Sequence, residues 1–413
     1  MALSLLLAAR LIAAVRGGGS LTQALAALDK QAPEARAAAQ DVAFGSLRCY
    51  GRGEFILRRL LARALPHAET EALLLGAFFR LQTRPGAAHL VVDQAVTAAG
   101  ELAGGAFKGL VNGVLRNFLR QQEELQAAMA ADEEARYQHP QWWVRRLRRA
   151  YPEQWQAIVG AGNQQAPMTL RINPRRGSLT DYLVRLQVSG LAARQVGTHA
   201  LLLREPIAFH LLPGFSEGLL SIQDAGAQRA AELLAPIAGE RILDCCAAPG
   251  GKTAHLLETA DVDLLAVDID PVRSARIEEN LRRLGLLAKV RVADCRTADG
   301  WWDGRPFDAI LADVPCSASG VVRRHPDIKY LRRESDIRQF VRLQGELLDR
   351  LWPLLKPGGR LLYATCSVFA EENDGQIDAF LFRQADAQRM TSARLLPDND
   401  HDGFYYALLH KRR

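Results

Sequence analysis

Short apolar segments alternate with helix-length segments through the C-terminal half of the chain, and this alternation strongly limits the possible folds. The apolar segments of strand length are Arg241–Cys246, Leu264–Asp268, Lys289–Ala293, Phe307–Ala312 and Arg360–Ala364. Strands that alternate with helices build a largely parallel, doubly wound sheet. Such a sheet binds ligands at the carboxyl ends of its strands. We therefore expect a Rossmann-like α/β domain over residues 226–413, with its functional residues just after the strands.

Two helices of this half have ends that the sequence marks. Asp270 is a suitable N-cap for the first helix, Pro271 suits its first turn, and Gly285 suits the position after its last residue. The second helix is predicted from about residue 335 to 355, where Lys356-Pro357-Gly358-Gly359 would end it.

Residues 1–138 are rich in alanine and leucine and predict an all-helical domain. The prolines of this part, Pro33, Pro66 and Pro85, stand where a helix could begin or end. The opening MALSLLLAARLIAAV lacks the basic start of a signal peptide, and Arg10 and Arg16 interrupt its apolar run. It predicts a buried helix that ends at residues 17–19. No stretch approaches the roughly 20 apolar residues that span a bilayer.

One helix of this domain has a clear apolar face. Phe107, Val111, Val114 and Phe118 recur every three or four residues, which places them on one side of a helix. The cations outside this face are Lys108, Arg116 and Arg120. The pattern leaves open whether they are simply solvated or contact RNA.

A second boundary is predicted at His139-Pro140, after a polar helix over residues 121–138. The short alternating runs MTLRINP and ALLLREP follow. They predict a small mixed α/β subdomain over residues 139–225.

Charge and cysteine content limit the class of protein. The net charge of +6 leans modestly toward a polyanionic partner. The cysteines form no CxxC pair, so they indicate neither a zinc ribbon nor a disulfide framework, and free thiols fit a reducing cytoplasm. They are Cys49, Cys245, Cys246, Cys295, Cys316 and Cys366.

A glycine-rich turn, CAAPGGKT over residues 246–253, follows the first predicted strand. It matches neither the dinucleotide fingerprint nor the phosphate loop of nucleotide hydrolases. Asp268 ends the second strand 18 residues after Gly250, near the spacing of an acid that accepts the hydroxyls of a ribose. Asp294 follows the third strand, where a carboxylate can accept an adenine amino group. These features indicate a nucleoside cofactor without a pyrophosphate.

Two cysteines follow the next two strands. Asp313 and Cys316 lie after the fourth strand, and Cys366 lies after the fifth. A single cysteine is usually a small core residue, but two at neighbouring strand ends beside an aspartate indicate chemistry. Carbon 5 of cytosine becomes nucleophilic when a thiolate adds to carbon 6, and a base must then remove the proton at carbon 5.

Four motifs now stand in order: CAAPGGKT, AVDID, DVPCS and ATCS. In order and spacing they resemble the RNA cytosine-5 methyltransferase family. The stretch GVVRRHPDIK, residues 320–329, is similar to the bacterial small-subunit ribosomal RNA subgroup in particular. VNGVLR, residues 111–116, resembles the RNA-binding antitermination factor NusB, as the N-terminal domain of that subgroup does. The resemblance covers nearly the whole chain.

The resemblance implies an S-adenosyl-L-methionine-dependent enzyme, without a metal, that forms 5-methylcytosine in 16S rRNA at position 967. It implies that Cys366 is the nucleophile and that Cys316 assists elimination. Asp313 would hold the cytosine around N3, with Lys252 near enough to pair with Asp313. The residues implied to line the cofactor site are Cys246, Ala247, Ala248, Pro249, Gly250, Gly251, Lys252, Asp268, Asp294 and Asp313.

Three positions depart from the family pattern. Ser319 stands where threonine is usual, which we expect to be tolerated. Cys295 stands where glycine is commoner, so a third thiol is expected near the cofactor. Cys245 doubles the cysteine of the first motif, and we interpret it as strand packing.

Basic residues cluster after the DVPCS motif, and this position favours phosphate contacts over a merely solvated face. They are Arg323, Arg324, Lys329, Arg332, Arg333, Arg338 and Arg342.

Three other functions compete with this interpretation. A transfer RNA cytosine-5 methyltransferase is disfavoured by the NusB-like part. A non-catalytic factor that binds ribosomal RNA during assembly is disfavoured by the two cysteine motifs, which binding alone does not need. A DNA-binding regulator is a more distant alternative. We therefore expect a monomer whose partner is RNA, foremost 16S rRNA, and neither DNA nor a membrane.

Overall fold

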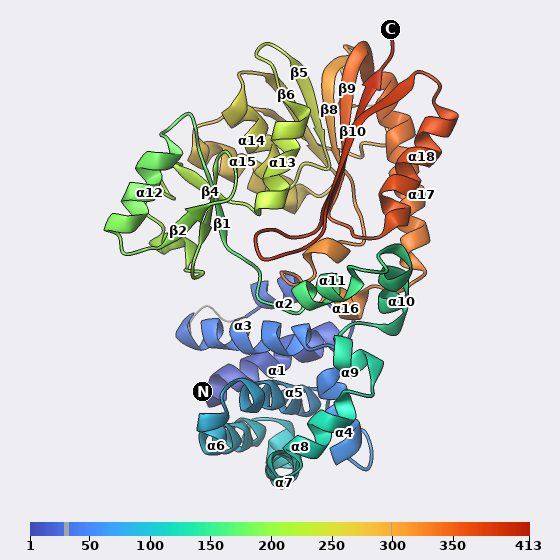
Figure 1. Cartoon of the computed structure of the whole chain (residues 1–413). Coiled ribbons are helices and arrows are strands. Elements are labelled where there is room, and N and C mark those ends of the chain that lie inside the picture. Colours follow the sequence, from blue (N-terminus) through green and yellow to red (C-terminus); the bar gives the residue numbers. More distant parts are fainter. Residues whose placement is uncertain (29–32, 299) are drawn as a thin grey trace. The chain divides into compact units, whose positions relative to one another are not determined.

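The computed structural model describes residues 1–28, 33–298 and 300–413 (Figure 1). The chain forms two compact units. The first comprises Met1–Gln165 and Val322–Glu334, and the second comprises Ala166–Val321 and Ser335–Arg413. The predicted boundaries at residues 138 and 225 stay predictions. None of the described helices has the length and apolar character needed to cross a bilayer.

The described part of the first unit contains helices and no strand, which confirms the all-helical prediction. Its first helix, α1, is buried along most of its length, as predicted, and it packs against α3 and α5. The helices are α1 (Ala2–Arg16), α2 (Leu21–Ala26), α3 (Pro33–Arg48), α4 (Arg52–Leu60), α5 (Ala68–Thr83), α6 (Ala88–Gly100), α7 (Lys108–Arg120), α8 (Gln122–Met129), α9 (Glu133–Tyr137), α10 (Gln141–Ala150), α11 (Trp155–Gly162) and α16 (Ile328–Leu331).

The apolar face predicted around α7 is confirmed for three of its four residues, whereas Phe107 precedes the helix and is half-buried. Val111, Val114 and Phe118 are buried, whereas the predicted cations Lys108, Arg116 and Arg120 are exposed.

The single polar helix predicted before His139 is wrong, because two helices, α8 and α9, occupy that stretch. The Asp132 side chain accepts a hydrogen bond from the Ala135 N–H at 2.9 Å and so begins a new helix.

The second unit contains a small antiparallel sheet of four strands in the order β2-β3-β1-β4. Its strands are β1 (Thr169–Ile172), β2 (Ala193–Gln195), β3 (Ala200–Leu203) and β4 (Leu220–Ile222). Helix α12 (Leu179–Val188) contributes Tyr182 and Leu186 to the apolar core of this sheet. The predicted mixed α/β subdomain is therefore confirmed.

The larger sheet has seven strands in the order β10-β11-β9-β8-β5-β6-β7. Strands β5 to β9 run parallel to one another, which confirms the predicted doubly wound domain. The strands are β5 (Arg241–Cys245), β6 (Asp263–Asp268), β7 (Lys289–Val292), β8 (Phe307–Asp313), β9 (Leu355–Thr365), β10 (Ala387–Leu395) and β11 (Phe404–Lys411).

Helices cover both faces of this sheet. Residues of α13 (Ala225–Leu234), α14 (Gly251–Thr259) and α15 (Pro271–Leu284) form an apolar core with one face. Residues of α17 (Asp336–Leu351) and α18 (Asp374–Arg383) form a core with the other face. The predicted caps of α15 are confirmed, because Asp270 accepts hydrogen bonds from the N–H groups of Val272 and Arg273 and Gly285 has φ 69°.

Two features of the sheet differ from the prediction. Helix α17 ends at Leu351, and residues 356–359 belong to β9 rather than to a helix end. Pro353 lies in the short 3-10 turn that follows α17, where it has no N–H to continue the helix. The sheet is largely parallel, as predicted, but it also has two C-terminal strands that the sequence did not predict. Strand β11 pairs antiparallel with β9, and β10 pairs antiparallel with β11.

Candidate active site

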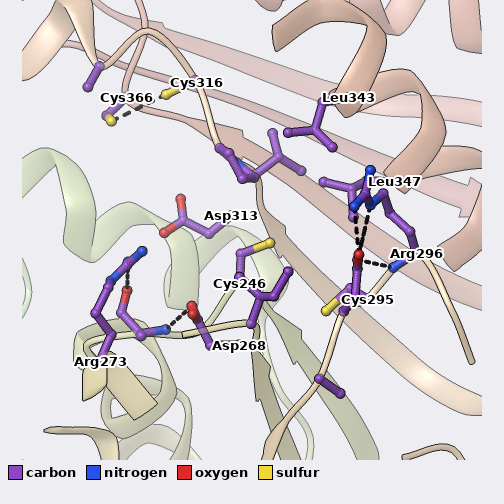
Figure 2. A pocket seen from close by; sticks show the side chains of 17 residues that line it. Cys246, Asp268, Arg273, Cys295, Arg296, Asp313, Cys316, Leu343, Leu347 and Cys366 are labelled. Atoms are coloured by element: carbon purple, nitrogen blue, oxygen red, sulfur yellow. Dashed lines mark hydrogen bonds and ion pairs between the residues drawn. The ribbon is translucent and has the colours of Figure 1, made fainter. Parts of the chain in front are cut away.

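The carboxyl ends of strands β5 to β9 surround a cavity of about 420 Å³ in the second unit (Figure 2). Asp268 and Asp313 are the last residues of β6 and β8, and Asp294 follows β7 by two residues. The lining residues that the sequence singled out are Cys246, Ala248, Asp268, Asp294, Asp313, Cys316 and Cys366, with Cys295 beside them. The predicted site residues therefore lie at the carboxyl ends of five different strands.

The glycine-rich turn lies between two hollows. Cys246 and Ala248 line the first cavity. Pro249, Gly250 and Gly251 instead line a second hollow of about 320 Å³. Gly250 has φ 93°, and a Cβ there would lie 3.0 Å from the Ile277 Cα, so this position favours glycine on two counts. The remaining predicted members of the turn, Ala247 and Lys252, line neither hollow.

Asp268 is held by the backbone on both of its carboxylate oxygens. Its Oδ2 accepts a hydrogen bond from the Ala248 N–H, and its Oδ1 accepts one from the Asp270 N–H, both at 3.0 Å. Each carboxylate oxygen has two lone pairs, so one acceptor position on each oxygen is left for a ligand in the cavity.

Asp294 already has a cationic partner. Arg296 donates from its Nε and Nη2 to the two oxygens of Asp294, the shortest contact being 2.7 Å. These hydrogen bonds hold the pKa of Asp294 below its usual value. Arg296 lines the cavity together with Arg273, whose Nη2 donates to the Ala248 carbonyl at 2.7 Å. The motifs gave no signal for either arginine.

Lys252 and Asp313 form an ion pair beside the cavity. The Lys252 Nζ lies 2.7 Å from the Asp313 Oδ2. Burial works against the charge on Lys252, but the attraction of Asp313 outweighs burial and raises the pKa of Lys252. Lys252 also interacts electrostatically with Cys366. The same ammonium group therefore acts on both Asp313 and Cys366.

The two cysteines of the DVPCS and ATCS motifs lie side by side. The Cys316 Sγ and the Cys366 Sγ are 3.4 Å apart (Figure 2). The hydrogen bond with Cys366, together with burial, raises the pKa of Cys316 well above its usual value. Cys316 therefore keeps its proton.

A buried carboxylate joins the two segments that carry these cysteines, which we call the cysteine loops (residues 314–319 and 366–369). Glu372 accepts hydrogen bonds from the Ser317 N–H at 2.8 Å and from the Ser317 and Ser367 hydroxyls at 2.5 Å. Gln344 donates to the same carboxylate at 3.1 Å. Burial raises the pKa of Glu372 even though every one of these donors lowers it.

Glu372 was missed in the sequence because it belongs to none of the four motifs. A usable signal is the pair of adjacent acids, Glu371 and Glu372, that directly follows the apolar run at residues 368–370.

Ser319 belongs to the same hydrogen-bond network. Its hydroxyl lies 3.1 Å from those of Ser317 and Ser367, and it accepts from the Val368 N–H at 2.9 Å. Every contact uses the hydroxyl group, which threonine also has, so the departure from the family pattern keeps the polar function.

Asp244 lies on β5, two residues before Cys246, and is fully buried. The Thr253 hydroxyl donates to its Oδ2 at 2.6 Å, while its Oδ1 has no hydrogen-bond partner. Burial raises the pKa of Asp244 to about 7.

The expectation that the basic cluster after DVPCS contacts phosphates is wrong for two of its members. Arg323 and Lys329 are each only 1% exposed. Within the first unit, Lys329 donates to the Arg48 carbonyl and to the Asn163 side chain. Buried cations of this kind bind their own chain rather than a solvent-side phosphate.

Three family models match successive parts of the chain. The model of the 16S rRNA methyltransferase RsmB/F matches residues 231–410. A ferredoxin-like domain of RsmF/B-like methyltransferases matches residues 139–210, and the NusB family matches residues 5–120.

Curated relatives match over nearly the full length. The Ribosomal RNA small subunit methyltransferase B of Vibrio cholerae is 45% identical over 408 residues, which cover 96% of this chain and 94% of the relative. The protein of the same name from Proteus mirabilis is 44% identical and covers 98% of each chain.

Solved structures share the fold. The crystal structure of PH0851 covers 98% of this chain and 99% of its own, with a TM-score of 0.82 at 24% identity. A methyltransferase homologue from Pyrococcus horikoshii covers 69% of this chain and 99% of its own, with a TM-score of 0.61 at 29% identity. NSun6 from Pyrococcus horikoshii, solved with SFG, covers 66% of this chain and 98% of its own, with a TM-score of 0.59 at 19% identity. From the full-length likeness to the curated relatives, the chain belongs to the 16S rRNA methyltransferase RsmB/F family.

Proposed function

We propose that this protein transfers a methyl group from S-adenosyl-L-methionine to carbon 5 of a cytosine in small-subunit ribosomal RNA. The observation that carries the proposal is the pair of thiols, Cys316 and Cys366, 3.4 Å apart on the cavity that Asp268 and Asp313 also line. The relatives named as small-subunit ribosomal RNA methyltransferases support the substrate class.

The cavity suits the cofactor in size and in polar groups. Its volume of about 420 Å³ lies in the range of small-molecule sites. Asp268 would accept the ribose hydroxyls with its two remaining acceptor positions, and Asp294, oriented by Arg296, would face the adenine amino group. Cys246 and Ala248 would line the site, whereas Pro249, Gly250, Gly251 and Lys252 would shape it from behind. When bound, the cofactor supplies an electrophilic methyl group.

The residues beside the cavity would have separate roles in the reaction of the cytosine base. Cys366 would add to carbon 6 of the cytosine, which makes carbon 5 nucleophilic. Asp313, held by Lys252, would hydrogen-bond the ring around N3. Cys316 would act after methyl transfer, when the proton at carbon 5 leaves and the bond between Cys366 and carbon 6 breaks.

The raised pKa of Cys316 supports this order. A protonated Cys316 does not compete with Cys366 for carbon 6. In the reverse arrangement, which is that of DNA cytosine methyltransferases, the cysteine after the proline would attack instead.

Methylation with labelled S-adenosyl-L-methionine tests the substrate. We expect label in bare or assembled small-subunit RNA, 5-methylcytosine at position 967 of 16S rRNA, and no label in bare tRNA. The Cys366→Ala protein is the control and should transfer none. Label confined to tRNA would favour the transfer RNA alternative. No label in any RNA, with the cofactor bound, would favour a non-catalytic binding protein.

A further inference from the structure

Three thiols that the proposed reaction does not use as reactants converge at one side of the cavity. The sulfur atoms of Cys245, Cys246 and Cys295 all lie within 4.8 Å of one another. The Sγ atoms of Cys245 and Cys246 are 3.7 Å apart. All three cysteines are free of disulfides.

Backbone geometry explains how neighbouring residues share this cluster. Successive side chains of a strand point to opposite faces, which would separate Cys245 from Cys246. Cys245 is the last residue of β5, and Cys246 has φ 61°. This left-handed conformation breaks the alternation, so both sulfurs meet Cys295, which follows β7 and Asp294.

The cluster has an entry path from the cavity. Cys246 and Cys295 line the cavity, whereas Cys245 is fully buried behind them. Figure 2 shows the sulfurs of Cys246 and Cys295 at the cavity. A small ion that enters would meet these two first and then the buried sulfur of Cys245.

We propose that Cys245, Cys246 and Cys295 form a three-sulfur site for a trivalent thiophilic ion with the chemistry of arsenite, and that its occupation excludes the nucleoside cofactor. Thiolate ligands select soft ions. Among the described residues, no fourth histidine, cysteine or carboxylate joins the three sulfurs. The cluster therefore suits a three-coordinate ion better than a structural zinc ion, which takes four protein ligands.

Charge decides between the soft ions. Three thiolates carry three negative charges, of which Cu⁺ would leave two uncompensated and Zn²⁺ would leave one. The carboxylates that line the same cavity, Asp268, Asp294 and Asp313, already outnumber its two arginines, Arg273 and Arg296. A further uncompensated buried negative charge is therefore strongly unfavourable. A trivalent centre cancels all three charges and leaves a neutral cluster.

The binding reaction balances without an oxidant or a reductant. Arsenite, As(OH)₃, exchanges its three hydroxyl groups for three sulfurs. Three S–H bonds and three As–O bonds break, three As–S bonds form, and three water molecules leave. Arsenic stays trivalent and each sulfur stays at the oxidation level of a thiol.

Competition with the cofactor rests on the proposed function. Cys246 begins the glycine-rich turn and Cys295 directly follows Asp294, so both border the space assigned to the nucleoside. An ion that draws the two sulfurs together would shift Cys246 and Cys295, and with them the walls of the nucleoside site.

The test uses the reduced full-length protein with Cys316→Ser and Cys366→Ser, because the thiol pair at 3.4 Å would itself bind arsenite. Native mass spectrometry with inorganic arsenite should show one arsenic gained and three hydrogens lost per chain. X-ray absorption should show three sulfur neighbours. Cys245→Val keeps an apolar side chain in the strand but removes one sulfur, and should weaken binding roughly tenfold or more. Cys295→Gly should do the same, and Cys49→Ser should bind as the parent does.

Two results would overturn the proposal: equal arsenite affinity in the parent and in both cluster variants, or only two sulfur neighbours around arsenic. Calorimetry with S-adenosyl-L-methionine separates the cluster from the function. Loss of cofactor binding on loading with arsenite supports the competition, and unchanged cofactor binding contradicts it. The protein could also bind arsenic through three sulfurs and yet bind no S-adenosyl-L-methionine when free of arsenic. That result would support the three-sulfur site and contradict the proposed methyltransferase function.

Discussion

Among single residues, Glu372 connects the two loops that carry the thiols proposed to react, Cys316 and Cys366. It does not line the cavity, but its carboxylate accepts hydrogen bonds from serines of both cysteine loops. Serine hydroxyls and a backbone N–H thus fix two segments that lie far apart in the sequence. Reactions that need aligned groups lose rate steeply when the groups move.

Replacing Glu372 should therefore affect turnover more than cofactor binding. Glu372→Gln keeps the shape but weakens the hydrogen bonds from two hydroxyls and one N–H, so we expect kcat to fall by roughly tenfold to a hundredfold. The affinity for S-adenosyl-L-methionine should be unchanged, because Glu372 lies outside the cavity lining. Steady-state kinetics and calorimetry measure the two quantities, and the exposed neighbour change Glu371→Gln is the control. A normal kcat would show that the loops hold their positions without this carboxylate.

Asp244 predicts a pH dependence of stability. Its pKa is raised from 3.8 to about 7 by burial, so its contribution to stability is fully present below about pH 4 and is lost as the pH rises through 7. In the Asp244→Asn protein the side chain at this position is uncharged at every pH. The unfolding free energy of this variant relative to the parent should therefore increase between pH 5 and 8, as measured by urea unfolding. The exposed Asp261→Asn should follow the parent, and a pH-independent difference for Asp244→Asn would contradict the assignment.

The individual residues of the site differ in how far the sequence revealed them. Cys316, Cys366, Asp268 and Asp313 were predicted because each stands in a motif at or just after the end of a strand. All four line one cavity. Glu372 could not be predicted in the same way, because its partners, the Ser317 and Ser367 hydroxyls, become neighbours only when the two loops fold together.

At the scale of elements, the five parallel strands β5 to β9 were predicted, whereas the two antiparallel strands β10 and β11 were not, although β11 is largely buried. Strands β5, β6, β8 and β9 are buried along most of their length, and each contains a run of apolar residues in the sequence. Strand β10 is an exposed edge strand whose residues are mostly polar or small, so it carries no apolar run. An edge strand is defined by its pairing, in this case with β11, and pairing is not visible in one sequence.

The end of helix α15 that faces the cavity provides a prediction at this scale. Asp270 accepts from the N–H groups of Val272 and Arg273 at 2.8 and 3.0 Å. Asp270→Ala leaves both donors to water and should lower the unfolding free energy by about 1 kcal/mol. Asp270→Asn keeps an acceptor and should lose less than half of that in the same urea titration. Equal losses would show that the carboxylate charge, rather than the cap, stabilises the helix.

At the scale of the whole molecule, the chain combines a NusB-like helical part with a methyltransferase part. The order of these parts was predictable from composition and motifs. The placement of Val322–Glu334 in the first unit was not, because that segment lies in the sequence between two segments of the second unit. Its contacts, such as the Asp327 carboxylate that accepts from the Leu21 N–H at 3.0 Å, join residues about three hundred positions apart.

The exposed cations of α7 predict how the helical part contributes to RNA binding. Arg116 and Arg120 are oriented by hydrogen bonds to Asn112 and Asn117. Changing Lys108, Arg116 and Arg120 together to glutamine should weaken RNA binding. It should also reduce the slope of log K against log salt by about 0.7 for each lost phosphate contact.

Fluorescence anisotropy at several salt concentrations measures both effects. The control, with Arg185, Arg204 and Arg350 changed to glutamine, has the same net charge. If the control variant loses as much RNA affinity as the α7 variant, the three cations of α7 are only solvated and do not contact RNA.

The division of labour between the two thiols is the central claim, and a covalent protein–RNA adduct tests it most directly. Turnover alone does not separate the two cysteines, because removing either member of a concerted unit can cost nearly the full rate. We predict that Cys316→Ala still attacks and methylates the base but cannot release it, so a methylated RNA joined to Cys366 accumulates and survives denaturing electrophoresis. Cys366→Ala should form no adduct. An adduct that forms with Cys366→Ala and is absent with Cys316→Ala would contradict the account and reverse the roles of the two cysteines.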